Sequence, residues 1–297
     1  MQRYLHFITN LCKMISGDKN GILINKPAGM TSHDVVNKLR KILHTKKVGH
    51  CGTLDPDATG VLVVCINKAT KVLQFLTSES KEYVATLNLG VSTDTYDASG
   101  KVLETKEYQK IDDDKIIACL KSFIGKQEQK PPLYSAIKIK GKKLYEYARS
   151  GENVEVPTRV VTIDYIDVLE IKENLIKFKV GCSKGTYIRS LCFDIAAKLG
   201  YPGHMQDLIR TKSGKFALND CFTLEEIEAG KFNCLSIETA LSDFKQLEVE
   251  DENIVYHGKK IKSDLNEQVV IVNRNKKVLA VYGPDGNGYL KNIRGLW

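Results

Sequence analysis

The sequence predicts an α+β protein with a mixed, largely antiparallel central sheet, flanking helices and a small β-rich C-terminal domain. Three observations favour this class. Segments with strand character outnumber those with helical periodicity. The two kinds do not alternate regularly, as they would in a doubly wound parallel sheet. Two apolar runs, 269–272 and 278–282, flank the polar residues 273–277 and predict a hairpin near the C-terminus.

The first third of the chain predicts short apolar strands and an amphipathic helix. Thr31 or Ser32 precedes apolar residues that recur at helical spacing up to Leu43, so either side chain is a candidate N-cap. The expected strands are 21–25, 61–66 and 81–90, and a short helix is expected at 72–76.

Caps and breakers indicate the remaining elements. Asp112 opens a helix that Gly125 follows, and the proline pair 131–132 interrupts any regular element. Thr223 and Glu226 have the spacing of a capping box. The other expected elements are a short helix to Arg149 closed by Gly151, strands 154–170 and 175–182 joined by a hairpin turn at 172–174, and a helix over 187–199 ended by Gly200. We therefore expect an N-terminal extension (1–20), a large domain (21–240) and a small C-terminal domain (241–297).

Composition favours an anionic partner and a reducing compartment. The net charge of +8 suits nucleic acid or an anionic membrane surface. The longest apolar stretch, 60–66, is far shorter than the ~18 residues that span a bilayer. No amphipathic basic helix stands out as a membrane anchor, so no membrane association is expected. The 8 cysteines include no Cys-x-x-Cys pair, and the 6 histidines show no metal-ligand spacing. We expect free thiols in the cytoplasm, no signal peptide and no structural metal.

The segment GHCGTLDPDATG, residues 49–60, holds the strongest candidate for catalysis, Asp55. Its glycines permit unusual backbone angles, and Pro56 biases Asp55 away from the α region. A carboxylate on a stiff loop that leads into the apolar strand 61–66 is a candidate nucleophile or acid–base group. The alternative is an Asx-turn, in which the carboxylate only bonds nearby backbone N–H groups.

Five segments together resemble the bacterial TruB family of tRNA pseudouridine synthases, which isomerise the uridine at position 55 in the T loop of tRNA. They are NKPAGMTS (25–32), GHCGTLDPDATGVL (49–62), KEYVATLNLG (81–90) with TDTYD (93–97), the stretch 131–151, and CSKGTYIR (182–189). The resemblance runs from about residue 21 to residue 216, with a weaker tail. It implies the pseudouridine synthase fold followed by a small PUA-like RNA-binding domain.

The resemblance implies that Asp55 is the catalytic aspartate and that Arg189 is its partner. The reaction breaks a C–N glycosidic bond, turns the uracil over and rebuilds a C–C bond through C5. The carboxylate could attack C1′ or C6, or remove a sugar proton to give a glycal, and the residues do not choose among these routes. Arg189 would orient the carboxylate and favour its ionised form. The reaction needs no redox cofactor and no metal.

The resemblance also assigns residues around the base. Tyr83 and Tyr187 match pocket tyrosines on which a flipped uracil can stack, and Tyr83 is a candidate to help remove the C5 proton. His50 matches a histidine that fills the gap left by the flipped base, and Leu208 matches an apolar contact to it. Taken one at a time, each of these side chains would more simply be a core residue.

The stretch 131–151 resembles the family's thumb, an insertion that closes over the T loop. Its lysines, Lys138, Lys142 and Lys143 among them, alternate with tyrosines and suit an RNA surface, although such a charge run also suits a solvated face. The expected partner is tRNA, bound through its T stem-loop, with no protein partner required and a monomeric enzyme.

Other functions stay open at this point. The chain could be an RNA-binding protein or tRNA-folding chaperone of the same fold, in which Asp55 is idle. It could be a synthase acting on another RNA, as the guide-RNA-dependent relatives do, or an enzyme of free nucleosides.

Overall fold

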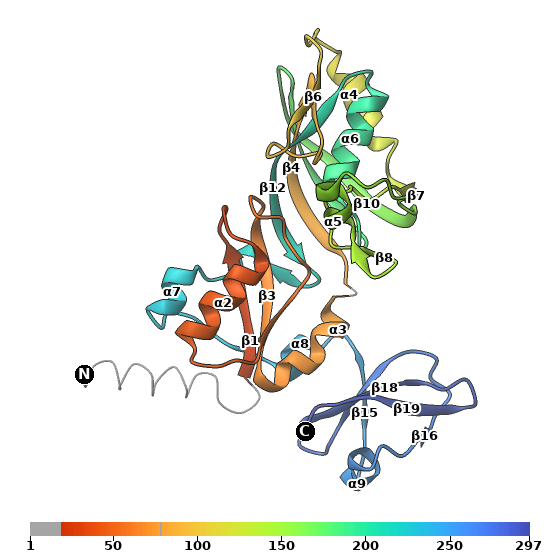
Figure 1. Ribbon diagram of the computed structural model, residues 1–297. Coiled ribbons are helices and arrows are strands. Elements are labelled where there is room, and N and C mark those ends of the chain that lie inside the picture. The colour runs from red at the N-terminus through yellow and green to blue at the C-terminus, as the bar shows by residue number, and fades with distance from the viewer. Residues whose placement is uncertain (1–18, 78) are drawn as a thin grey trace. The chain divides into compact units, whose positions relative to one another are not determined.

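The computed structural model describes residues 19–77 and 79–297, so most of the expected N-terminal extension lies outside the described residues (Figure 1). The chain forms two compact units. The second unit comprises residues 57–60 and 79–218, and the first unit comprises the rest. The expected division at residues 20 and 240 stays a prediction.

The first unit begins with a small sheet covered by a helix. Strand β1 pairs with β14 and lies next to β3, which pairs with β2 in antiparallel fashion. The apolar side chains of α2, which starts at the predicted cap Thr31, pack on β1 and β3 in one buried cluster. The elements are β1 (Lys19–Lys26), α2 (Ser32–Ile42), β2 (Val48–Cys51), β3 (Thr59–Ile66), η1 (Asn67–Val72), α3 (Leu73–Leu76), α7 (Leu224–Glu228), β14 (Leu235–Ser236) and α8 (Ile237–Ala240).

The C-terminal part of the first unit is a five-stranded sheet in the order β15-β17-β18-β19-β16 with its own buried core. Strands β17 and β18 form the predicted hairpin, and the side chain of Asn273 accepts hydrogen bonds from turn N–H groups. The elements are β15 (Lys245–Glu248), α9 (Glu252–Tyr256), β16 (Ile261–Lys262), β17 (Val269–Val272), β18 (Val278–Pro284) and β19 (Tyr289–Gly295).

The second unit is built on five strands in the order β12-β4-β11-β10-β7, all antiparallel. Helix α6 packs on β12 and β4, and α4 packs on β10, so both cover the sheet (Figure 1). Its elements are β4 (Lys81–Leu89), β5 (Val91–Thr93), β6 (Val102–Thr105), α4 (Asp113–Lys121), β7 (Gly125–Gln129), β8 (Lys138–Ile139), β9 (Lys142–Lys143), α5 (Leu144–Ser150), β10 (Arg159–Lys172), β11 (Leu175–Cys182), α6 (Ile188–Lys198), β12 (Gly203–Ser213) and β13 (Phe216–Ala217); η2 (Leu218–Asp220) follows.

The predicted fold class is confirmed, but several elements differ from expectation. The strand expected from residue 154 begins at Arg159, because Pro157 has no N–H with which to join a ladder. Strand β12 was not predicted, since two bulges against β4 interrupt its alternation. The hairpin β5–β6 was also not predicted, because all four residues of β6 are exposed and its apolar residues, Val102 and Leu103, are adjacent and do not alternate with polar ones.

Gly60 brings the end of the Asp55 loop against β12. Thr59 and Gly60 pair in parallel with Ile209 and Arg210. Gly60 has φ 103°, and an added Cβ would lie 2.2 Å from the carbonyl oxygen of Arg210. Only glycine fits here, so the backbone that follows the loop has a fixed position on the sheet.

The contrast between Gly60 and Gly29 gives a stability prediction. Gly29 has φ 75°, but no atom lies within 4 Å of an added Cβ. Gly29→Ala should cost about 1–2 kcal/mol for a left-handed alanine. Gly60→Ala should cost clearly more, since the steric overlap adds to the same strain. Urea unfolding of both variants measures the difference, and equal losses would contradict the assigned close approach.

Candidate functional site

Buried polar contacts hold the Asp55 loop from within the first unit. The side chain of Lys26 is fully buried, and its Nζ donates to the carbonyl oxygens of Pro27 (2.8 Å), Met30 (2.5 Å) and Pro56 (2.8 Å). The ammonium thereby ties the residue after Asp55 to the turn that precedes α2. Backbone anchoring of this kind reduces the freedom of the half-buried Asp55 between its neighbours.

Ser32 holds the other side of the loop. Its hydroxyl accepts a hydrogen bond from the N–H of Leu54 (2.9 Å) and donates to the carbonyl oxygen of the same residue (3.3 Å). His50 lies at the start of the segment 49–60, in β2 opposite Val64, and is half-buried. The first unit thus contains both Asp55 and His50, and the residues flanking Asp55 are held by the segment that starts α2.

Arg189 lies in the first turn of α6 in the second unit and is 5% exposed. Its Nη1 donates to the carbonyl oxygen of Thr95 (3.1 Å) and to Oδ2 of Asp97 (3.2 Å), and its Nη2 donates to the carbonyl oxygen of Tyr134 (3.0 Å). These contacts join the helix to the turn 94–97 and to the start of the thumb segment, 131–151.

Asp97 is oriented by its own turn. Its Oδ1 accepts hydrogen bonds from the hydroxyl of Thr95 (2.6 Å), the hydroxyl of Ser99 (2.6 Å) and the N–H of Ser99 (3.0 Å). The other oxygen therefore points to Arg189. Asp97 lies in the TDTYD segment, but no sequence signal marks it as a partner of Arg189.

Tyr83 and Leu208 lie on one face of the sheet. Tyr83 on β4 is opposite Arg210 on β12, and Leu208 is opposite Ala85. Directly opposed residues of an antiparallel pair project to the same side, and so do residues two apart. Both side chains are 8% exposed. The register therefore brings together two of the predicted base-contacting residues.

Glu82 fixes β4 from the opposite face. It accepts hydrogen bonds from the hydroxyls of Tyr165 on β10 and Thr211 on β12 (2.7 Å), and Lys212 lies 3.6 Å away. Burial raises the pKa of Glu82, but these hydrogen bonds outweigh it and the net shift is downward. The strand that carries Tyr83 is thus tied to strands on both sides.

Gln129 holds the backbone of Tyr187 immediately before α6. The amide side chain of Gln129 donates to the carbonyl oxygen of Tyr187 (3.0 Å) and accepts from its N–H (2.8 Å). The guanidinium of Arg159 lies 5.5 Å from the Tyr187 ring centroid, which is a cation–π contact. Sequence reasoning missed both supporting residues, because they lie on other strands, far away in the chain.

The thumb segment is a hairpin followed by a helix. Lys140 and Gly141 both have positive φ and connect β8 to β9 as a two-residue turn. Lys138 is exposed. The ammonium of Lys142 lies 2.6 Å from Glu152, and that of Lys143 lies 3.2 Å from the hydroxyl of Tyr145. Lys138 is therefore the readiest of the three for an external anion.

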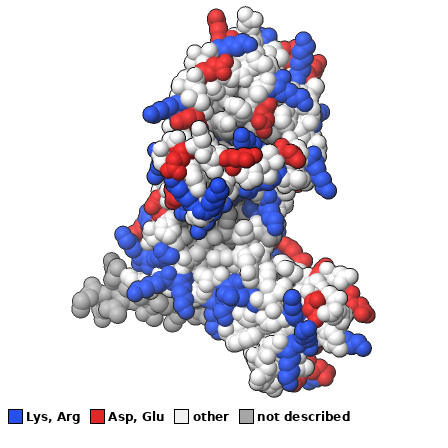
Figure 2. Space-filling view, turned by 45° about the vertical axis from the view of Figure 1, so that its right-hand side comes forward, with Lys and Arg blue, Asp and Glu red and all other residues white. Residues whose placement is uncertain are grey.

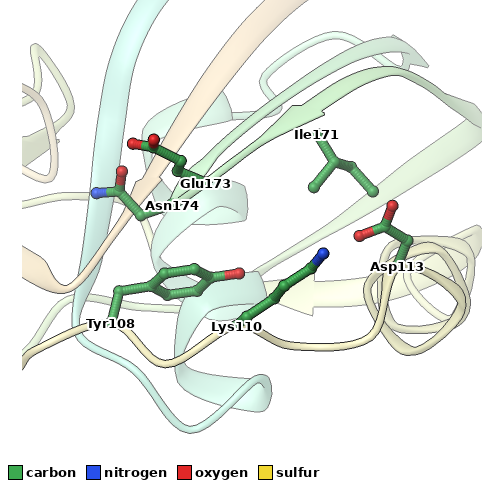
Figure 3. Close-up of a pocket in the computed structure, with 6 residues that line it drawn as sticks. All are labelled: Tyr108, Lys110, Asp113, Ile171, Glu173 and Asn174. Atoms are coloured by element: carbon green, nitrogen blue, oxygen red, sulfur yellow. The ribbon is translucent and has the colours of Figure 1, made fainter.

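A cavity of about 550 Å³ lies elsewhere in the second unit, between the segment that enters α4 and the β10–β11 turn (Figure 3). Its lining residues are Tyr108, Lys110, Asp113, Ile171, Glu173 and Asn174. None of them is a predicted site residue, and their charges are mixed. This cavity therefore offers no arrangement for the expected chemistry.

The distribution of surface charge does not by itself identify a binding surface for a partner. On the face drawn in Figure 2, basic and acidic side chains are interspersed over the upper part, and Lys and Arg predominate across the middle of the view. Within residues 19–77 and 79–297, no group of three or more His, Cys, Asp or Glu side chains has the geometry of a metal site. No helix of that part of the chain is long and apolar enough to cross a membrane.

Two protein domains of known families match successive parts of the chain. Residues 40–188 match the "TruB family pseudouridylate synthase (N terminal domain)", and residues 189–244 match the "tRNA pseudouridylate synthase B C-terminal domain". A Bacillus cytotoxicus protein named tRNA pseudouridine synthase B is 45% identical over 295 residues, which cover 93% of this chain and 96% of that protein. The Bacillus subtilis protein of the same name is 54% identical over 220 residues, 71% of this chain and 70% of that one.

Solved structures are also similar to this chain. A chain in the crystal structure of a Cbf5-Nop10-Gar1 complex matches with a TM-score of 0.75 and 27% identity, covering 97% of this chain and 87% of that one. A chain of an H/ACA RNP bound to a substrate RNA containing 2'-deoxyuridine matches with a TM-score of 0.72 and 26% identity, covering 94% and 86%.

Asp194, five residues after Arg189 on α6, gives a pH prediction. Burial raises the pKa of its carboxyl from 3.8 to about 6. The neutral form is therefore favoured by folding, and this contribution is lost as pH rises through the folded-state pKa. Asp194→Asn should raise the melting temperature at neutral pH, and the gain should vanish below about pH 4, where the carboxyl is neutral in both the folded and the unfolded wild type. A gain independent of pH would contradict this assignment.

Proposed function

We propose that this chain, which belongs to the TruB family of pseudouridylate synthases and isomerises uridine to pseudouridine in tRNA, acts on the T-loop uridine at position 55. The observation that carries the proposal is the 45% identity to a tRNA pseudouridine synthase B across 93% of the chain. The geometry of each unit supports it, because the residues matching the family's motifs lie on loops and strands that buried contacts hold in place.

The reaction is an internal rearrangement. The bond between C1′ and N1 of the uracil breaks, the base turns over, and a bond forms between C1′ and C5. C5 loses its proton and N1 gains one, so substrate and product have the same atoms and no electrons are exchanged with another molecule. The protein must therefore hold a detached base, position one carboxylate and move protons.

Asp55 supplies that carboxylate in our proposal. Attack at C1′, attack at C6 and removal of a sugar proton all need it ionised and steadily placed. Lys26 and Ser32 support this role, because they anchor Pro56 and Leu54 on either side of it. An Asx-turn residue would need no such fixed neighbours.

Arg189 acts as the partner of Asp55 in the proposal, and chain connectivity is compatible with it. Thr59 follows Asp55 by four residues, which span at most about 14 Å. Thr59 pairs with β12 beside Gly60, whose partner Arg210 lies opposite Tyr83 on β4. Asp55 is therefore four residues along the chain from a residue that pairs with these strands.

The base pocket consists of Tyr83, Tyr187 and Leu208. An extruded uracil can stack on an aromatic ring and contact the leucine, which offsets the stacking lost in the RNA. The supports of Tyr187 favour this role, since a clamped backbone keeps the ring in place. His50 fills the gap that the base leaves. Tyr83 also assists removal of the C5 proton.

The thumb segment and the C-terminal sheet complete the proposed RNA surface. Lys138, Lys142 and Lys143 contact phosphates of the T stem-loop, and the C-terminal sheet serves as the PUA-like domain. We propose a cytoplasmic enzyme that works as a monomer without a protein partner. The similar Cbf5 chain is in a complex with other proteins, but the tRNA synthase relatives favour direct recognition of tRNA.

Asp55→Ala should abolish tritium release from C5-labelled uridine in unmodified tRNA, while tRNA binding stays within a few fold, because the step lost is chemical. Asp57→Ala, in the same loop and exposed, is the matched control and should retain activity. The assay is run in EDTA with purified chain only. Product from pure Asp55→Ala would refute the role of the carboxylate. A wild type that binds tRNA and releases no tritium would favour the chaperone.

Neutralising thumb lysines should flatten the salt dependence of tRNA binding. Each lost phosphate contact lowers the slope of log K against log salt by roughly 0.9. Lys138→Gln should flatten the slope more than Lys142→Gln does, since the ammonium of Lys142 already contacts Glu152. Lys115→Gln, at an exposed residue of α4 outside the thumb segment, removes the same charge and should leave the slope unchanged. Equal slopes in all variants would exclude the thumb segment from the interface.

A further inference from the structure

Tyr96 has a backbone conformation that is unfavourable for its residue type. Its φ is 63°, in the left-handed region, although it is an aromatic residue and not glycine. Such a conformation costs free energy and persists only where the surrounding structure enforces it. Tyr96 lies between Thr95 and Asp97, the two residues of this turn that bind Arg189.

Several contacts oppose this strain. The ring of Tyr96 is stacked on that of Phe193 with centroids 4.3 Å apart and an interplanar angle of 20°. The carbonyl oxygen of Tyr96 accepts a hydrogen bond from the N–H of Met205 (2.9 Å) on β12, and its N–H donates to the carbonyl oxygen of Thr93 (3.3 Å). The turn is thus fixed by one aromatic contact to α6 and by backbone contacts on either side.

The strained residue determines what Arg189 can reach. The carbonyl oxygen of Thr95 and the carboxylate of Asp97 both bind the same nitrogen, Nη1, at 3.1 and 3.2 Å. Groups on either side of a residue converge in this way because the left-handed conformation of Tyr96 turns the chain back on itself. With an extended backbone at Tyr96, the carbonyl oxygen of Thr95 and the carboxylate of Asp97 would point in different directions.

Phe193 and Arg189 share a side of α6. They are four residues apart on this helix, about one turn, and so their side chains project from the same face. Residues 95–97 therefore contact that face of α6 twice, through the Tyr96–Phe193 stack and through the hydrogen bonds of Arg189. The stack sets the distance between the helix and the turn, and the hydrogen bonds then orient the guanidinium.

We propose that Tyr96 and Phe193 are positioning residues for Arg189, and that their stack holds the turn in the strained conformation that aims the guanidinium. This inference rests on the proposed role of Arg189 in the reaction. In this proposal both rings act through Arg189 and not on the substrate. If the stack served stability alone, the unfavourable backbone conformation of Tyr96 would have no purpose, because it lowers stability.

The hydroxyl of Tyr96 is not part of this device. Burial, and to a lesser degree the charge of Asp194, raise the pKa of Tyr96, so it remains a neutral phenol. Tyr96→Phe keeps the stack and should match wild type. Tyr96→Gly removes the stack and also relieves the backbone strain, so it separates positioning from stability. Phe193→Leu removes the other half of the stack.

The test measures single-turnover tritium release, tRNA affinity and melting temperature for these variants. Tyr96→Gly and Phe193→Leu should each lose about tenfold or more in single-turnover rate. Their tRNA affinity should stay within about twofold, as expected for an effect on the transition state alone. The double variant should lose little more than either single variant, because both remove one contact. A full rate in Tyr96→Gly, or lower melting temperatures with unchanged rates, would overturn the proposal.

A second readout does not depend on activity. The guanidinium resonances of Arg189, assigned with Arg189→Lys, should report a held side chain in wild type and Tyr96→Phe and a mobile one in Tyr96→Gly. Unchanged resonances in Tyr96→Gly would overturn the positioning role even if tRNA turned out to be modified elsewhere. Absent tritium release in wild type would instead contradict the proposed function alone.

Discussion

A buried guanidinium sets the geometry of the second unit around α6. The side chain of Arg189 takes its acceptors from Thr95, Asp97 and Tyr134, which are far from it in the chain. A cation removed from water is tolerated only where its donors find partners. The helix, the turn 94–97 and the start of the thumb segment must therefore keep their places together, since a shift in any of them would leave a buried charge poorly bonded.

The same principle recurs around the Asp55 loop. The ammonium of Lys26 is buried and bonds three backbone carbonyl oxygens, one of them that of Pro56. In both units a buried cation thus organises irregular backbone that no helix or strand would hold. Loops that carry function are usually mobile, and such anchoring reduces that mobility. At the turn that contains Tyr96, an unfavourable backbone conformation likewise accompanies the positioning of a functional side chain.

Much of the fold could be predicted because its signals are local. The strands 81–89 and 175–182 alternate cleanly, and the helix caps at Thr31 and Thr223 stand directly before their helices. Strand β12 escaped prediction because its bulges break the period of two on which such reasoning depends. It nevertheless carries Leu208 and is paired with both β4 and Gly60.

The sequence by itself determined the fold class, most elements, and the motif residues Asp55, Tyr83, Tyr187 and Arg189 as candidates. Only the tertiary structure decided that Leu208 and Tyr83 share a face, and that Asp97 orients Arg189. The physical reason is the sequence separation of the groups that interact. Periodicity and capping act over a few residues, whereas the contacts of Arg189 join groups 92 and 94 positions apart, and only the path of the folded chain brings them within hydrogen-bond distance.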